Sequence, residues 1–296
     1  MGENTALLAL LYPQVGRGAA AAELRRRFEE GELPSQMLQR PEENSLLDAD
    51  PAEALDAAQA MLDGWAAEGI NVLTPFDDLY PAQMRSVFDY PLVIFARGQV
   101  RNDRLSAAVV GSRDVSASGL RFSGELAGLL AEDDITVVSG LARGVDGAAH
   151  RAALAAGGRT VAVLGNGLRS TYPAEHKALQ EQITTSGLVI SQFRPEARPS
   201  RQTFPQRNIT MSAYSSITVI AEASEKSGTR IQANAAIKHA RPLVLTAQVV
   251  ENTTWGTTFA SGGYDVTVVS TAEEGRQAVR EILERTMHAT RWLART

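Results

Sequence analysis

The feature that most constrains the fold is a unit repeated four times between Ala107 and Arg230, in which an apolar run leads into a glycine-containing turn. The apolar runs are Ala107–Val110, Ile135–Val138, Thr160–Leu164 and Ile217–Ile220. In an open parallel sheet, ligands bind outside the carboxyl ends of the strands. A helix that begins after such a turn offers free backbone N–H groups to an anion. The four turns therefore predict one anion-binding edge.

The alternation of apolar runs and helical segments predicts an α/β fold. Nearly all-apolar strands that alternate with helices are typical of a parallel sheet covered on both faces. We expect strands near 106–110, 135–138, 160–164, 187–191, 217–221, 242–246 and 265–269. We expect helices near 118–131, 145–156, 174–185, 207–214, 228–239 and 271–287. The fold class is a Rossmann-like parallel sheet with helices on both faces, preceded by a small helical N-terminal region.

The N-terminal part has a different pattern. Short helical segments precede an amphipathic helix expected at Pro51–Glu68, which Gly69 ends. A short strand at Ile70–Leu73, a small helix opened by Tyr80-Pro81 and a strand at Leu92–Ala96 follow. We expect a helical region over residues 1–68 and a Rossmann-like domain over residues 69–296.

Composition excludes several classes of protein. Hydrophobic residues make up 44% and charged residues 21%, which is typical of a soluble globular chain. There is no cysteine, so disulfides, thiolate catalysis and cysteine zinc sites are excluded. The four histidines are scattered, and we expect no metal, no cofactor and no catalytic residue. No signal-like or membrane-spanning run is seen, which predicts a cytoplasmic protein.

Charge is unevenly distributed along the chain. Residues 1–100 hold 7 Lys and Arg against 16 Asp and Glu, a balance of −9. Residues 101–296 hold the other 22 Lys and Arg against 18 Asp and Glu, a balance of +4. The glycine turns therefore lie in the basic part, and a local basic patch can attract nucleic acid even in an acidic protein.

Each turn admits both a binding and a structural interpretation. Arg113 offers a planar fork of donors suited to phosphate, although Gly111-Ser112-Arg113 is also a plausible helix-capping turn. His150 is interpreted as a packed helix residue rather than a general base, because no nucleophile stands in a recognisable relation to it. Tyr172 either stacks on a base or packs at a helix start. Arg207 and Asn208 either contact a ligand or lock their loop.

Two common nucleotide-binding motifs are absent. The order of Lys226-Ser227-Gly228 is wrong for a Walker P-loop, which disfavours an ATPase. Gly111 does not open the G-x-G-x-x-G fingerprint of dinucleotide-binding proteins. The absence of both motifs therefore disfavours an enzyme that uses a nucleotide for catalysis.

Taken in order, the turns resemble the motifs of the DNA-processing protein A family (DprA, also called Smf). The matching segments are Gly111–Gly119, Ser139–His150, Gly157–Gly167, Tyr172-Pro173, Phe204–Asn208 and Glu222–Gly228. The resemblance covers residues 65–245. Departures include Ser118 in place of the usual tyrosine, Ile209–Ser215 after the fifth motif, and Thr246-Ala247 in place of a Pro-Gly pair. They mark a divergent member.

The resemblance implies a non-catalytic protein of DNA processing, recombination or natural transformation. Such a protein binds and protects single-stranded DNA, forms a homodimer and loads a RecA-type recombinase. Arg113, Arg143, Arg207 and Lys226 are the expected contacts to DNA phosphates. The full set of expected DNA or phosphate-binding residues is Gly111, Ser112, Arg113, Ser139, Gly140, Arg143, Gly144, Gly165, Gly167, Arg207, Asn208, Lys226, Ser227 and Gly228.

Two alternatives stay open. The same Rossmann-like pocket suits a sensor or hydrolase of a nucleotide-like small molecule, because Ser227-Gly228-Thr229 lies where nucleotide phosphoribohydrolases carry their glycine motif. The second alternative is a protein that binds a partner and whose ancestral ligand site is no longer used.

Overall fold

The computed structural model describes residues 2–11, 18–39 and 50–293. They form two compact units, one within residues 1–80 and 91–96 and the other within residues 81–90 and 97–296. The predicted helical region 1–68 includes residues outside this description, namely 1, 12–17 and 40–49. The predicted domain boundary between residues 68 and 69 stays a prediction.

The first unit is built around a buried helix. Its elements are α1 (Glu3–Leu11), α2 (Gly18–Glu29), α3 (Pro34–Leu38), α4 (Pro51–Ala67), β1 (Asn71–Leu73) and most of β2 (Ile94–Gly98). The side chains of Ala6–Leu10 are at most 1% exposed, and α1 packs on α3 and α4. Asp50 accepts hydrogen bonds from the N–H groups of Ala52 and Glu53 and so caps α4. The helix predicted at Pro51–Glu68 is confirmed.

The second unit contains the parallel sheet. Its strands are β3 (Ser106–Gly111), β4 (Thr136–Ser139), β5 (Thr160–Val163), β6 (Leu188–Ser191), β7 (Ile217–Glu222), β8 (Leu243–Thr246) and β9 (Val266–Val269). Its helices are α5 (Ala117–Glu132), α6 (Val145–Ala155), α7 (Lys177–Ser186), α8 (Thr203–Tyr214), α9 (Thr229–Lys238), α10 (Ala247–Asn252), α11 (Thr254–Ser261) and α12 (Ala272–Leu293). Every strand predicted for this unit is confirmed.

Three predictions about helices need correction. Helices α10 and α11 are absent from the sequence expectation, because α10 has only six residues, two of them valine, and α11 holds three threonines and a glycine, all residues of low helix propensity. Side-chain capping offsets this: the hydroxyl of Thr253 accepts from the N–H of Gly256 at 3.0 Å. The helix expected at 174–185 begins with a short 3-10 turn, η3 (Ala174–His176). The small helix expected at Tyr80-Pro81 is instead the 3-10 turn η2 (Met84–Ser86).

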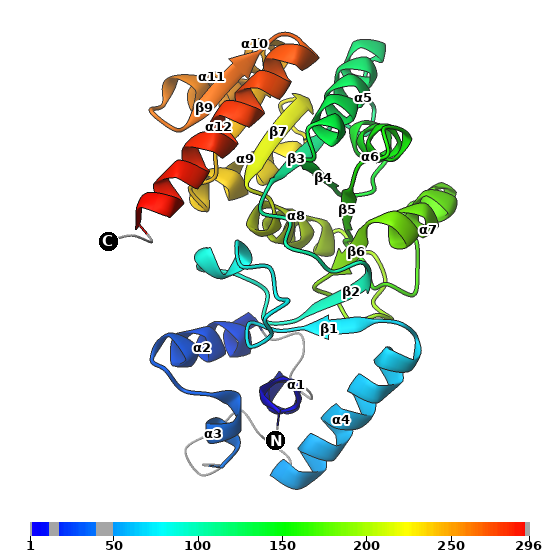
Figure 1. Cartoon of the computed structure of the whole chain (residues 1–296), viewed down its shortest axis with the longest axis vertical. Coiled ribbons are helices and arrows are strands. Elements are labelled where there is room, and N and C mark those ends of the chain that lie inside the picture. The colour runs from blue at the N-terminus through cyan, green and yellow to red at the C-terminus, as the bar shows by residue number, and fades with distance from the viewer. Residues whose placement is uncertain (1, 12–17, 40–49, 294–296) are drawn as a thin grey trace. The chain divides into compact units, whose positions relative to one another are not determined.

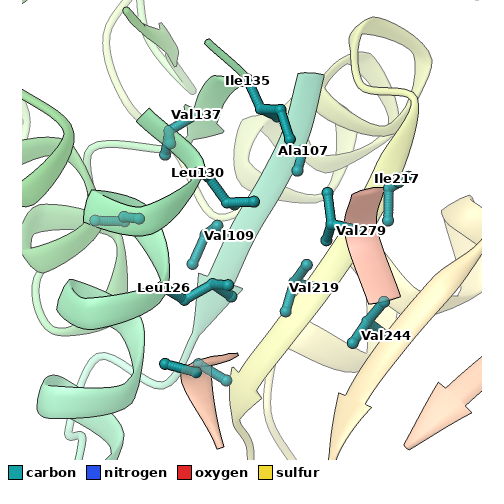
Figure 2. Close-up of a cluster of buried hydrophobic side chains, with 14 of the residues drawn as sticks. Ala107, Val109, Leu126, Leu130, Ile135, Val137, Ile217, Val219, Val244 and Val279 are labelled. Atoms are coloured by element: carbon teal, nitrogen blue, oxygen red, sulfur yellow. The ribbon is translucent and has the colours of Figure 1, made fainter. Parts of the chain in front are cut away.

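Helices α5, α6 and α12 cover one face of this sheet. Ala107, Val109, Val137 and Val219 point from the strands into a cluster with Leu126 of α5, and each is fully buried (Figure 2). Alternate strand residues face the other side, where α8 and α9 pack together (Figure 1). Both faces are therefore covered, as the nearly all-apolar strands predict.

The strand order places a topological switch point at the centre of the sheet. The parallel strands follow the order β6-β5-β4-β3-β7-β8-β9. The chain runs outward from β3 to β6 and then returns to the other side of β3 as β7. Ligands bind at such a switch point in open α/β sheets. The ends of β3 and β7 are therefore the place to look for a site.

No helix in the described part of the chain is long and apolar enough to cross a membrane. Within residues 2–11, 18–39 and 50–293, no group of three or more His, Cys, Asp or Glu side chains is placed to hold a metal ion.

Candidate functional site

A cleft of about 440 Å³ opens at the switch point. Its wall comes from the turn after β3, the first turns of α8, the loop after β7 and the first turns of α9. The lining residues include Gly111, Ser112, Arg113, Asp114, Asp146, Arg201, Phe204, Arg207, Asn208, Ser227, Gly228 and Gln232. The cleft thus brings together seven of the predicted site residues from three separate motifs.

A buried arginine forms one wall of this cleft. Arg207 is 5% exposed, and its Nη1 donates to the carbonyl of Val163 at 3.2 Å. Its other close partner is Asp146, whose Oδ2 lies 3.8 Å from Nη1. The guanidinium fits because residue 140 is glycine: a Cβ at Gly140 would lie 1.2 Å from Arg207 Nη1. Gly140 therefore serves to admit Arg207.

Asp146 and Arg207 do not fully compensate each other's buried charge. Asp146 accepts from the N–H groups of Gly140 and Ala142, at 3.1 and 3.3 Å. Burial nevertheless raises the pKa of the Asp146 carboxyl, against the lowering effect of Arg207. Burial lowers the pKa of Arg207, Asp146 opposes this, and the charge of Arg113 lowers it further. The lining holds three arginines, Arg113, Arg201 and Arg207, against two carboxylates, Asp114 and Asp146, so the cleft is cationic.

Arg113 and two aromatic rings form a stack at the side of the cleft. The guanidinium of Arg113 lies 5.0 Å from the centre of the Phe204 ring. The ring of Tyr172 lies 5.4 Å from that of Phe204 and is tilted by 43°. Tyr172 stands two residues before η3 in the chain and is 44% exposed.

The loop after β7 forms the opposite wall. The hydroxyl of Ser227 accepts from the N–H of Thr229 at 3.1 Å at the start of α9. Asn208 donates to the carbonyl of Gly228 at 3.3 Å and so ties α8 to this loop. A Cβ at Gly228 would meet nothing within 4 Å, so this glycine borders open space. Lys226, next to the lining residues, is exposed and has no ion-pair partner in the part of the chain that the structure describes.

Several predicted site residues lie outside the cleft lining. Contacts with neighbouring protein atoms explain why these residue types occur at their positions. Ser139 is fully buried and donates to the carbonyl of Val109 at 2.7 Å. A Cβ at Gly165 would lie 2.7 Å from the Phe204 ring, and one at Gly167 would lie 2.1 Å from the carbonyl of Arg194. Gly144 has φ +71, a conformation that favours glycine. Their direct contact with a ligand stays a prediction.

Arg143 is also outside the lining. It is paired with Glu175 of η3, through Nε–Oε1 at 2.8 Å and Nη2–Oε2 at 2.7 Å. Both side chains are more than half exposed. Arg143, which was predicted to contact a phosphate, is therefore already bonded to the Glu175 carboxylate.

Arg201 and Gln232 are two of the lining residues that were not predicted from the sequence. Arg201 stands in the loop between β6 and α8, which holds several arginines and could have been noticed from composition alone. Gln232 of α9 is 1% exposed, and its Oε1 has no hydrogen-bond donor among the described residues. Nothing in the sequence distinguishes it from other helix residues, because its place depends on the packing of α9 beside β7.

His150 supports a prediction about stability rather than catalysis. It is fully buried, with Nδ1 bonded to the hydroxyl of Thr160 at 2.7 Å, and burial lowers its pKa to about 3. Unfolded histidine takes up its proton at about pH 6.5. The stability that neutral His150 contributes is therefore present above that pH and is lost as the pH falls toward 3.

We expect the unfolding free energy of the wild type to fall more steeply than that of His150→Gln, by about 1.4 kcal/mol per pH unit below about pH 6. Urea unfolding at several pH values measures the two slopes. Parallel curves would contradict the assignment.

The fold and the cleft together define a Rossmann-like α/β protein with a cationic site at its switch point. Residues 71–274 match the family model for DNA recombination-mediator protein A. The chain belongs to this family.

Individual relatives agree with this assignment. Over 168 residues the chain is 38% identical to the DNA processing protein DprA of Streptococcus pneumoniae, covering 56% of this chain and 58% of that protein. The X-ray structure of DprA from S. pneumoniae aligns with a TM-score of 0.64 and 26% identity over 92% of this chain and 91% of that chain. The chain spans about half the length of the curated relatives it matches.

A second solved structure is that of DNA processing protein A from Helicobacter pylori, which was described for its mode of binding single-stranded DNA. It aligns with a TM-score of 0.63 and 25% identity over 72% of this chain and 96% of that chain.

Proposed function

We propose that the cleft binds the backbone of single-stranded DNA and that the protein acts in DNA recombination or transformation. The observation that carries this proposal is the buried Arg207 beside Arg113. Arg207 Nε has no hydrogen-bond acceptor among the residues that the structure describes. A buried cation without full compensation is costly. A phosphate in the cleft would supply both the charge and the acceptor.

The surroundings of the cleft favour a strand over a single small anion. Arg201 and Lys226 are exposed and unpaired within the described residues, and they flank Arg113 and Arg207 in the chain segments that form the walls. Phe204 adds an aromatic surface. Positive charges along a groove with interspersed aromatic rings are typical of sequence-independent single-strand binding. The relative from H. pylori supports the same ligand.

The proposal is a binding function without a reaction step. His150 is fully buried and bonded to Thr160, so it is not placed to act as a general base. By analogy with the family we further propose a homodimer in the cytoplasm that loads a RecA-type recombinase onto the bound strand. Mass measurement in solution and co-purification with RecA test these two points.

The direct test compares single-stranded and duplex DNA in an electrophoretic shift assay at several salt concentrations. We expect the single strand to bind more tightly, and log K to fall with log salt with a slope of about −0.7 per phosphate contact. Equal affinity for duplex, or affinity independent of salt, would refute the proposal.

A second candidate is a nucleotide-like small molecule. The cleft volume of about 440 Å³ is in the range of small-ligand pockets, and the unsatisfied Oε1 of buried Gln232 is an acceptor for a base N–H. Calorimetry with mononucleotides and with an oligonucleotide separates the two functions. Tight nucleotide binding without oligonucleotide binding would favour the second.

A further inference from the structure

The ion pair between Arg143 and Glu175 stands beside the cleft. Arg143 follows Ala142, which lines the cleft, and it lies in the loop between β4 and α6. Its guanidinium makes two parallel hydrogen bonds to the Glu175 carboxylate, at 2.8 and 2.7 Å. Guanidinium groups bind phosphate through this same two-bond geometry. Glu175 thus occupies Arg143 in the way a DNA phosphate would.

An exposed aromatic ring lies near this pair. Tyr172 is 44% exposed, and its ring lies 5.4 Å from that of Phe204, which lines the cleft. The pKa of Arg143 is raised chiefly by its hydrogen bonds to Glu175 and to a smaller extent by Tyr172 and Asp114, so these groups share one neighbourhood. A cation and an exposed aromatic ring therefore lie near each other at the rim.

We propose that Arg143, Tyr172 and Glu175 form a subsite for one further nucleotide at the rim of the cleft. In this rim subsite a DNA phosphate replaces the Glu175 carboxylate on Arg143, and the adjoining base packs on Tyr172. The inference rests on the proposed single-strand binding. Glu175 is then a built-in competitor of DNA for the Nε and Nη2 donors of Arg143.

Replacement is feasible because the pair is exposed. The side chains of Arg143 and Glu175 are 63% and 51% exposed, and exposed ion pairs contribute little to stability. The competition should therefore be modest and measurable, and removing Glu175 should leave the fold intact.

The first test is Glu175→Gln, measured by fluorescence anisotropy with a labelled oligonucleotide. We expect affinity to rise about two- to fivefold. Glu181→Gln is the matched control, because Glu181 is an exposed carboxylate on the adjoining α7 without an ion-pair partner in the described residues. It removes the same charge without freeing Arg143. In an Arg143→Gln background, Glu175→Gln should lose its advantage over Glu181→Gln.

The second test separates the base from the phosphate. Tyr172→Ala should weaken binding of a base-bearing oligonucleotide about fivefold or more, yet leave binding of an abasic oligonucleotide of equal length unchanged. Tyr172→Phe should retain wild-type affinity. Tyr264→Ala is the control, because Tyr264 is 48% exposed and lies after α11, outside the cleft lining.

The outcomes are distinct. If the wild type binds the oligonucleotide but Glu175→Gln equals Glu181→Gln, the rim subsite is wrong and the proposed function stands. An equal effect of Tyr172→Ala on both oligonucleotides would also overturn the subsite. If the wild type binds no single strand, the proposed function itself fails.

Discussion

Reversing the charge at both Arg113 and Lys226 is expected to weaken single-strand binding about 100-fold, because two charge-assisted phosphate contacts are lost. Arg113 lines the cleft beside Phe204, and Lys226 stands in the loop that forms the opposite wall. The salt slope should also become shallower by about 1.4, which corresponds to two single-strand phosphate contacts. Anisotropy titration of Arg113→Glu/Lys226→Glu at several salt concentrations measures both quantities.

A matched control uses one arginine and one lysine at the other end of the sheet. Arg104 precedes β3, and Lys238 ends α9, so both lie away from the carboxyl ends of the strands, and both are exposed. Arg104→Glu/Lys238→Glu changes net charge equally. If this control weakens binding as much as the double variant in the cleft, general electrostatics rather than the cleft explains the affinity.

Asp103→Ala is expected to lower the unfolding free energy by about 3–5 kcal/mol, the usual cost of breaking a buried ion pair. The Asp103 carboxylate is 3% exposed and accepts from Arg159 Nε at 2.6 Å and Nη2 at 2.9 Å. It also accepts from the hydroxyls of Thr136 at 3.0 Å and of buried Tyr214 at 2.5 Å. Removing it leaves a half-buried guanidinium and two buried hydroxyls without their acceptor.

The control for this prediction is Asp265→Ala. Asp265 also pairs with an arginine, at 2.7 Å from Arg285, but both side chains are more than half exposed. An exposed pair is worth about 1 kcal/mol or less. Urea unfolding of both variants compares them directly, and similar losses would show that burial does not decide the cost.

Much of the second unit could be predicted from sequence because its strands other than β9 are buried on both faces. Runs such as Val161–Val163 are apolar throughout, and each is followed by a turn and a helix. Helices α10 and α11 could not be predicted in the same way, since they depend on the capping hydroxyls of Thr246 and Thr253. Local propensity there is too weak to indicate a helix.

The candidate site was predictable only in part. Residue type and order indicated the ends of β3 and β7, where Arg113 and Ser227 line the same cleft. The sequence could not show that Gly140 makes room for Arg207, because the two belong to different motifs that meet only in the folded sheet. Nor could it show that Arg143 is already paired with Glu175. Most of the glycines expected to face a ligand also make room for neighbouring protein atoms.

The most direct test of the account is hydrogen–deuterium exchange with and without a single-stranded oligonucleotide. We predict that bound DNA slows exchange in residues 111–114 and 224–229, which form the two walls of the cleft. Residues 104–106 and 239–242, at the amino ends of β3 and β8, should exchange equally with and without DNA. Tight binding that leaves the cleft segments unprotected would contradict the central claim that this cleft holds the strand.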